Sequence, residues 1–183
     1  MDELEFRLAD RADAPTLAAL HAGAAAALTH RFGEGRWSKA PSERAVAASF
    51  GQAQLWLAHR AGEPAATFRL STRKPWAIDP AYFTPARRPL YLTDLAVDPG
   101  EQGRGVGRRC MAEVDRIAAE WPADAVWLDA FDADAGAGGF YLACGYREVG
   151  RAVYRGNPLV YFEKRIEPHG ELGGPAPQRA RRP

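Results

Sequence analysis

The chain has 183 residues, 46% of them hydrophobic and 26% charged, and its formal net charge is +1 at pH 7. These values are typical of one globular domain, and the near-neutral charge gives no general attraction to nucleic acid or to a membrane surface. No apolar run reaches the roughly 18 residues of a membrane-spanning helix, and the acidic residues 1–5 do not resemble a secretory signal. We therefore expect a cytoplasmic protein with no nucleic-acid and no membrane partner.

The first elements predicted along the chain are a strand and a long helix. Residues 4–9 alternate between apolar and polar side chains, which predicts a half-buried strand. Asp13 is predicted to cap the following helix, whose apolar stripe is Leu17, Leu20, Ala24 and Leu28. His21 and His30 have no partner at metal-ligand spacing, so both are expected at the surface and no metal site is predicted.

Two aromatic loops flank a predicted hairpin. Residues 29–41 form a loop that contains Trp37, after which Ser42 is predicted to cap a second helix. Residues 55–59 and 65–70 are typical of antiparallel strands joined at Gly62. Residues 71–89 follow as a proline-rich and aromatic stretch that is too long for an idle connection. Both loops can wall a substrate pocket or simply pack onto the core, and the sequence leaves these alternatives open.

The most informative stretch is a strand, a glycine-rich turn and a helix that together span residues 91–121. Residues 91–97 are apolar and β-branched enough for a buried strand, which Asp98-Pro99-Gly100 ends. Backbone N–H groups at the start of the helix can form an anion site, because the turn holds the glycines Gly103, Gly105 and Gly107. Arg104 and Arg108 add positive charge. The turn is therefore predicted to bind a phosphate-bearing ligand.

The remaining elements complete one domain at residues 1–166. A strand is predicted at 126–131, a short helix at 138–144, and two antiparallel strands at 147–154 and 159–166. Residues 167–183 contain mainly Gly, Pro and Arg and are predicted to be a disordered tail. Cys110 and Cys144 are interpreted as buried small apolar residues, and a catalytic thiol is the lesser alternative because no histidine lies near either in sequence.

The glycine spacing distinguishes between phosphate-binding motifs. A Walker A loop needs a Lys-Ser/Thr pair that this turn lacks, and the dinucleotide fingerprint Gly-x-Gly-x-x-Gly is not matched. The segment Gln102-Gly103-Arg104-Gly105-Val106-Gly107, preceded by Leu95-Ala96-Val97-Asp98-Pro99, resembles the acetyl-CoA signature of the GNAT family of N-acetyltransferases. The resemblance implies that amides from Gln102 to Arg108 hold the coenzyme A pyrophosphate. It also implies that the backbone of residues 95–97 pairs with the pantetheine arm.

A second stretch resembles the same family. In Asp134-Ala-Gly-Ala-Gly-Gly-Phe140-Tyr141, Asp134 stands where the family usually has Asn, which affects the hydrogen bond that this side chain would donate. The resemblance implies that Tyr141 protonates the departing thiolate; a structural tyrosine is the alternative. The residues expected to contact the coenzyme are Leu95, Ala96, Val97, Gln102, Gly103, Arg104, Gly105, Val106, Gly107, Arg108, Asp134, Phe140 and Tyr141.

Acetyl transfer to an amine requires two further groups. A backbone N–H in residues 95–97 is expected to polarise the thioester carbonyl. Asp94, the carboxylate just before the pantetheine-binding segment, is our candidate general base. A structural role for Asp94, a water chain, and the carboxylates Asp129 and Glu148 stay open as alternatives.

We therefore predict an α/β fold: one GNAT-like domain with a mixed, mostly antiparallel sheet of about seven strands, about four helices and splayed central strands. The expected activity moves the acetyl group of acetyl-CoA, the acyl-donor substrate, to a primary amine of a small molecule or of a peptide, by direct attack on the thioester. Two alternatives stay open: a non-catalytic acyl-CoA-binding sensor, and a Rossmann-like oxidoreductase in which Asp129 binds a ribose. The acceptor, the acyl chain length and the formation of a homodimer are not determined by the sequence.

Overall fold

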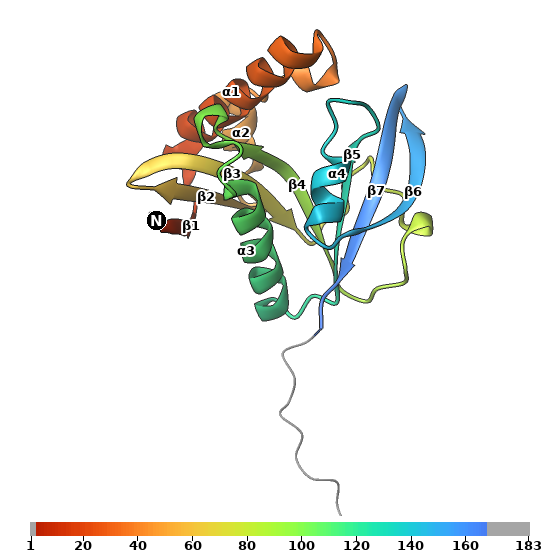
Figure 1. The fold of residues 1–183 in the computed structure, drawn as a ribbon. Coiled ribbons are helices and arrows are strands. Elements are labelled where there is room, and N and C mark those ends of the chain that lie inside the picture. The colour runs from red at the N-terminus through yellow and green to blue at the C-terminus, as the bar shows by residue number, and fades with distance from the viewer. Residues whose placement is uncertain (1–2, 168–183) are drawn as a thin grey trace, which may run out of the picture.

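Seven strands form one sheet in the order β1-β2-β3-β4-β5-β7-β6 in the computed structural model, which describes residues 3–167 (Figure 1). All neighbouring strands pair antiparallel except β4 and β5, which are parallel. The predicted mixed, mostly antiparallel sheet is confirmed, so the largely parallel sheet of a Rossmann-like oxidoreductase is wrong for the described residues. The tail predicted to be disordered lies, from residue 168 onward, outside that range. The strands are β1 (Leu4–Leu8), β2 (Gln54–Arg60), β3 (Glu63–Ser71), β4 (Pro89–Val97), β5 (Ala125–Phe131), β6 (Arg147–Tyr154) and β7 (Asn157–Arg165).

The parallel contact between β4 and β5 is short. Residue pairing runs only from Pro89 with Ala125 to Tyr91 with Trp127, although both strands continue. Beyond Tyr91, β4 stays paired to β3 on its other side, and β5 stays paired to β7. The facing edges of the two strands are therefore unpaired in their second halves, and the predicted splaying of the central strands is confirmed.

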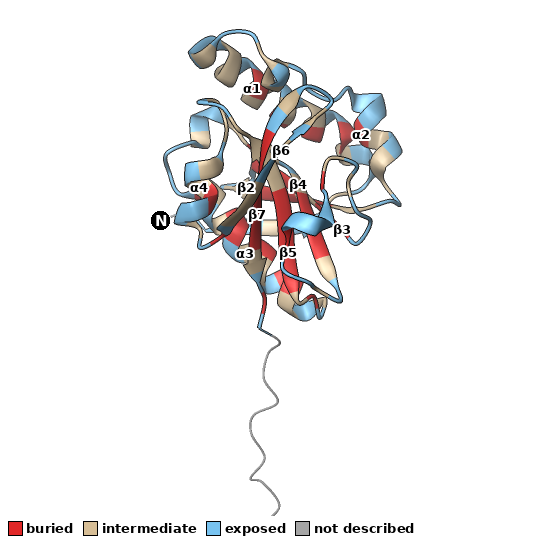
Figure 2. Ribbon diagram, turned by 90° about the vertical axis from the view of Figure 1, so that its right-hand side faces the viewer, coloured by how far each residue is buried: buried red, intermediate tan, exposed pale blue. Residues whose placement is uncertain are grey.

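Within residues 3–167, four α-helices cover the two faces of this sheet, and the strands between them carry most of the buried residues (Figures 1 and 2). Helix α3 buries Val106, Cys110, Met111, Val114, Ile117 and Ala118 in the largest core cluster, together with Leu90 and Leu92 of β4. Helices α1 and α2 pack on the opposite face, against Leu55 and Leu57 of β2. The helices are α1 (Ala14–Phe32), α2 (Glu43–Ser49), α3 (Val106–Glu120) and α4 (Gly138–Ala143).

The aromatic connection between β3 and β4 has two parts. Phe83 stacks on Trp127 of β5 with 4.4 Å between the ring centroids, and Ile78 is buried in the same cluster. Trp76, in contrast, is 83% exposed. The loop therefore covers the β5–β7 half of the sheet with its later residues and leaves an unburied indole near its start.

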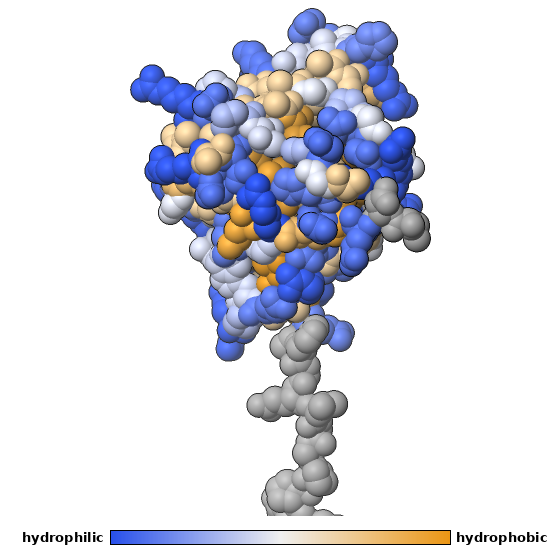
Figure 3. All heavy atoms as spheres, turned by 90° about the vertical axis from the view of Figure 1, so that its left-hand side faces the viewer, coloured by the Kyte–Doolittle hydropathy of each residue, from blue (hydrophilic) through white to orange (hydrophobic). Residues whose placement is uncertain are grey.

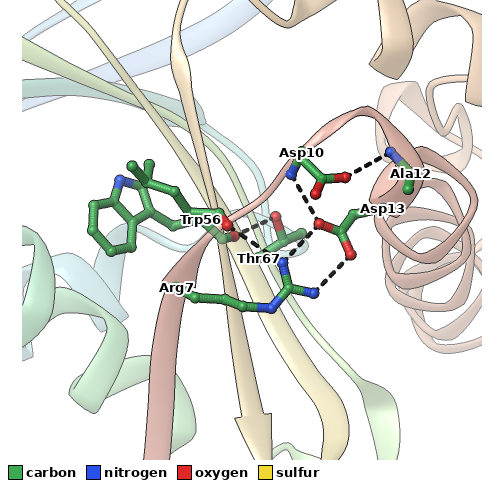
Figure 4. A network of polar contacts seen from close by, with 7 residues as sticks. Arg7, Asp10, Ala12, Asp13, Trp56 and Thr67 are labelled. Carbon is green, nitrogen blue, oxygen red and sulfur yellow. Dashed lines mark hydrogen bonds and ion pairs between the residues drawn. The ribbon is translucent and has the colours of Figure 1, made fainter.

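The start of α1 differs from the prediction. Asp13 makes no capping hydrogen bond to α1. Its carboxylate instead accepts hydrogen bonds from both terminal nitrogens of Arg7, each at 2.7 Å, and from the Asp10 N–H at 2.9 Å (Figure 4). Asp10 caps the short 3₁₀ turn Arg11–Asp13 by accepting from the Ala12 N–H at 2.7 Å. The cap lies three residues earlier because this turn precedes the α-helix.

The end of α1 also differs, because the helix continues to Phe32 into the predicted loop at 29–41. Gly33 ends it with a φ of +80° and donates its N–H to the Thr29 carbonyl oxygen at 2.8 Å. The Ser42 cap of α2 is confirmed, since its side chain accepts from the Ala45 N–H at 3.3 Å.

The surface that carries β1, on the left of Figure 1, is mainly hydrophilic with apolar residues gathered at its centre (Figure 3). Within residues 3–167 no helix combines the length and hydropathy that crossing a membrane requires.

Candidate active site

The turn between β4 and α3 is shaped by its own polar groups and glycines. Asp98 accepts from the Gly100 N–H at 2.8 Å, which starts the 3₁₀ turn Pro99–Glu101. Gly103 and Gly105 have φ values of +75° and +80°, a region that glycine adopts without strain. Gly105 is the N-cap residue of α3. The chain thus turns sharply from the end of β4 into the helix.

The backbone amides of this turn are unengaged. Among residues 3–167, no carbonyl or side chain accepts a hydrogen bond from any amide between Gln102 and Arg108; the first intrahelical bond is from the Arg109 N–H to the Gly105 carbonyl oxygen at 3.1 Å. Buried amides normally have a partner, whereas the first turn of a helix provides free donors with a partial positive charge. This row of donors is suited to an anion such as a phosphate.

A cavity of about 820 Å³ opens beside the turn, between the outer half of β4, α1 and α4. Arg104 does not line it, because its guanidinium pairs with Glu101 at 3.2 Å. Asp134 lines it and is exposed. The predicted coenzyme residues that line this cavity are Leu95, Ala96, Val97, Gln102, Gly103, Gly105, Val106, Gly107, Arg108, Asp134, Phe140 and Tyr141. We call this the coenzyme cavity.

Gly107 allows α4 to approach α3. A Cβ atom at Gly107 would lie 3.2 Å from two ring atoms of Phe140, closer than nearly all real contacts of this kind. The two sequence stretches that resemble the family signatures therefore meet in space through this pair. The side chain of Gln102 secures the other end of the turn by donating to the Val97 carbonyl oxygen at 3.2 Å.

Tyr141 lies where the coenzyme cavity meets a second cavity. Its ring is held by Phe140, Tyr146 and Phe162, with centroids 5.3, 6.1 and 5.7 Å away. Its hydroxyl makes no hydrogen bond within the described range, and the residue lines both cavities. Burial, with the negative charge of Asp129 as a smaller cause, raises the pKa of the Tyr141 phenol above its usual 10. The phenol is thus a protonated donor at neutral pH.

The second cavity, of about 690 Å³, shares eight lining residues with the coenzyme cavity, including Leu95, Ala96 and Tyr141. Both aromatic loops predicted from the sequence contribute to its wall, through Trp37 and Trp76. Trp37 is fixed by a hydrogen bond from its Nε1 to the Gly33 carbonyl oxygen at 3.0 Å. We call this the acceptor cavity.

The two carboxylates of the acceptor cavity are Asp94 and Asp129, one from each diverging strand. Asp94 lies in a β-bulge, because Thr67 pairs with Ala96 while Arg69 pairs with Thr93. One residue of β3 is thus opposite two of β4, and Asp94 has a φ of +56°. This left-handed conformation is unusual for an aspartate.

The bulge reverses the alternation of β4. Leu90 and Leu92 face the α3 side, and an unbroken strand would place Asp94 on that same apolar face. After the bulge, Leu95 and Val97 face the α3 core instead, so Asp94 is turned into the acceptor cavity. Leu95 and Val97 therefore share one face, and the regular alternation with Leu90 and Leu92 is broken at Asp94.

Asp129 lies on β5 and is the less exposed of the two carboxylates. Burial, together with the nearby negative charge of Asp94, raises the pKa of Asp129 to about 6. A carboxyl group with this pKa can exchange a proton near neutral pH. Glu148, the other carboxylate weighed from the sequence, pairs with Arg151 at 2.8 Å and lines neither cavity.

His21 is not the surface residue that the sequence predicted. It is half-buried and lines the acceptor cavity from α1. Burial lowers its pKa, with Asp94 acting in the opposite direction, so the imidazole is neutral at pH 7. Ala24, Ala25 and Leu28 line the same cavity, and their spacing from His21 places all four residues on one face of the helix. This spacing is the sequence signal that could have placed His21 on the cavity side of the helix.

The two cysteines take no part in either cavity. Cys110 is fully buried, and burial raises the pKa of its thiol to about 12. Cys144 is half-buried and packs against the same core cluster. The prediction of a buried residue is confirmed for Cys110, whereas Cys144 packs on the core but stays partly exposed.

Comparisons with known proteins agree with this geometry. The family model described as "Acetyltransferase (GNAT) family" matches residues 24–146. No curated protein sequence matches the chain. Among solved structures, the ribosomal-protein alanine N-acetyltransferase from Escherichia coli has a TM-score of 0.68 at 17% identity, over 94% of this chain and 99% of its own.

Two other similar structures contain a coenzyme. The protein yncA from Salmonella typhimurium, solved with its cofactor acetyl-CoA, has a TM-score of 0.63 at 14% identity, over 97% of this chain and 99% of its own. A ribosomal alpha-N-protein acetyltransferase in complex with coenzyme A has a TM-score of 0.62 at 17% identity, over 89% and 94% of the two chains. At these identities the likeness concerns the fold.

Proposed function

Because this chain belongs to the acetyltransferase (GNAT) family, we propose that it transfers the acetyl group of acetyl-CoA to the primary amine of a small molecule. The observation that carries the proposal is the row of unengaged amides between Gln102 and Arg108, which faces the same cavity as Tyr141. A diphosphate suits those donors, and Tyr141 stands where a reacting group beyond the diphosphate can reach it.

The lining of the coenzyme cavity fits coenzyme A. Arg108 adds a cation beside the amides, and the unpaired edge of β4 at Leu95, Ala96 and Val97 offers backbone groups to the amides of a pantetheine arm. The two coenzyme-bound neighbours share this fold. When bound, acetyl-CoA supplies an activated thioester whose carbonyl carbon accepts the amine.

The carboxylates of the acceptor cavity would prepare the amine. An acceptor ammonium cannot attack until it loses a proton, and Asp129 is a partly buried carboxylate with a pKa near the working pH. Asp94, the base that we expected from the sequence, faces the same cavity and stays a candidate. We favour Asp129 as the proton acceptor and Asp94 as a charge that raises its basicity.

Tyr141 would complete the transfer. As the new C–N bond forms and the C–S bond breaks, the Tyr141 hydroxyl gives its proton to the departing sulfur, and a backbone N–H in residues 95–97 stabilises the carbonyl oxygen. Both cysteines lie outside the two cavities. The amine therefore attacks the thioester directly, with no acyl-enzyme.

A calorimetric titration with coenzyme A, followed by a thiol-release assay with acetyl-CoA and a panel of amines, tests this function. We expect saturable binding and thiol release with at least one small amine. Binding without release from any small or peptide amine would favour the sensor, and release only with peptides would move the activity to a peptide amine. Absence of binding would refute the proposal.

A further inference from the structure

A third cavity, of about 280 Å³, adjoins the acceptor cavity and shares His21, Pro41 and Asp94 with it. Its floor is the α1–α2 face of the sheet, where Leu55 of β2 and Arg69 of β3 pair in register. Helix α2 closes the other side through Val46 and its neighbours. We call this the side cavity. It is large enough for a small polar group of a molecule whose remainder lies in the acceptor cavity.

Arg69 is the cation of the side cavity, and its guanidinium is poorly engaged. Its Nε is buried and makes no hydrogen bond in the part of the chain that the structure describes. Its only ion pair there, to Asp94, spans 3.5 Å, the longest such distance in the structure. Arg7 provides the contrast, since both of its terminal nitrogens lie 2.7 Å from the Asp13 carboxylate.

An unsatisfied guanidinium beside a cavity can bind a ligand that accepts hydrogen bonds. A buried N–H without a partner is destabilising, so a water, an ion or a ligand that accepts its hydrogen bond is expected beside it. The planar fork of an arginine matches a carboxylate, which accepts two parallel hydrogen bonds. Asp94 is the only acidic side chain among the lining residues, so it is the only anion there that competes with a ligand for Arg69.

The position of Arg69 relative to the reacting groups restricts the ligand. Asp94 lies beside Arg69 and lines both the side cavity and the acceptor cavity. Asp129 and Tyr141 line the acceptor cavity but not the side cavity. A ligand that reaches Arg69 with an anion and Asp129 with an amine must carry both groups close together. Any further part of the ligand then lies beside Trp37 and Trp76, which line the acceptor cavity.

We propose that Arg69 binds the carboxylate of the acceptor, and that the acceptor is a free amino acid with an apolar or aromatic side chain. The inference rests on the proposed acetyltransferase function and names its substrate class. The amino group lies between Asp94 and Asp129, the carboxylate enters the side cavity, and the side chain lies along Trp37 and Trp76. Arg69 is a specificity residue in this arrangement and takes no part in proton transfer.

The test compares the twenty free amino acids with their amides and with the corresponding decarboxylated amines in the thiol-release assay. For at least one apolar or aromatic amino acid, kcat/KM should exceed that of its amide and its decarboxylated analogue by at least about tenfold. Arg69→Gln should reduce this preference toward one, mainly by raising KM for the amino acid, and Arg69→Lys should restore part of it. Arg44→Gln, an exposed position on α2 that lines none of the three cavities described above, is the matched control and should keep the full preference.

Calorimetry with coenzyme A in every variant separates the outcomes. Unchanged coenzyme affinity in Arg69→Gln shows that the variant is folded and that only acceptor recognition has changed. The proposal is overturned if the wild type uses amino acids and their amides equally well, or if Arg69→Gln keeps the full preference. It is also overturned if the protein acetylates amines but no free amino acid. Failure of the underlying function looks different, because neither coenzyme binding nor thiol release would then occur with any amine.

Discussion

The coenzyme cavity and the acceptor cavity are built in opposite ways. The coenzyme cavity relies on consecutive backbone groups, the amides between Gln102 and Arg108 and the free edge of β4. The acceptor cavity relies on side chains from separate elements, among them His21 of α1, Asp94 of β4 and Asp129 of β5. The first needs a local conformation, whereas the second needs the whole sheet to be assembled. Substitutions should therefore separate the two cavities cleanly.

The largest expected effect is in the acceptor cavity. Asp129→Asn removes the proposed proton acceptor, so kcat/KM should fall by on the order of 1000-fold while coenzyme affinity is retained. In the wild type, Asp129 acts when deprotonated, so kcat/KM should decline as the pH falls through about 6. Steady-state kinetics between about pH 5 and about pH 9 measure the loss in the variant and the pH dependence of the wild type.

Glu148→Gln is the matched control for Asp129→Asn, because Glu148 is an ion-paired carboxylate outside both cavities. It should leave kcat/KM and the acid limb unchanged. Normal turnover in Asp129→Asn would show that Asp94 or a water chain removes the proton instead.

The next effect lies at the junction of the two cavities. Tyr141→Phe should lower kcat by about 100-fold, because the departing thiolate loses its proton donor, with little change in coenzyme affinity. Tyr146→Phe removes a buried hydroxyl of a residue that lines neither cavity, and it keeps the ring that packs against Tyr141. Thiol-release kinetics should therefore distinguish the two variants, and equal activity would remove Tyr141 as the acid.

A smaller effect is expected on the coenzyme side. Gly105→Ala places a side chain at a φ of +80° with nothing within 4 Å, so its cost is backbone strain of about 1 kcal/mol. If the strain relaxes by moving the amides, the Kd for coenzyme A should rise about fivefold with the acceptor KM unchanged. Gly51→Ala has the same strain at a φ of +85° in the turn between α2 and β2. It should lower Tm without changing the Kd measured by calorimetry.

The smallest effect concerns the interaction between the two carboxylates. Asp94→Asn removes the negative charge that helps to raise the pKa of Asp129. The acid limb of kcat/KM should move to lower pH by less than about one unit, since burial is the larger cause and persists. If the acid limb of kcat/KM moves to higher pH or disappears, Asp94 is the titrating base instead.

This contrast explains how much could be predicted from the sequence. The residues expected to contact the coenzyme come from two short stretches that resemble family signatures. Glycine spacing and the helix start are local features of such stretches, and all of these residues but Arg104 line the coenzyme cavity. Arg104 pairs with Glu101, a competition that no motif encodes. On the acceptor side, the orientation of Asp94 depends on the bulge in the pairing of β3 with β4. A long-range register of this kind leaves no periodic signal in one strand.

Arg69 and His21 show the same limit in different ways. Arg69 looks like an ordinary polar position in a strand until α2 closes a cavity over it. His21 had a helical spacing from the cavity-lining residues Ala24 and Leu28, but only the fold shows that this face meets a cavity. The sequence left open whether the aromatic loops wall a pocket or pack onto the core, and in the structure the loop before β4 does both, a division that depends on tertiary contacts.

The short parallel contact between β4 and β5 has a consequence for solubility. Unpaired strand edges usually sit at the rim of a sheet, where they can recruit a strand from another molecule and start aggregation. Here two such edges face each other in the middle of the sheet, flanked by α1 and α4. The protein thereby keeps backbone donors and acceptors ready for a slender ligand while holding them away from the strands of other chains.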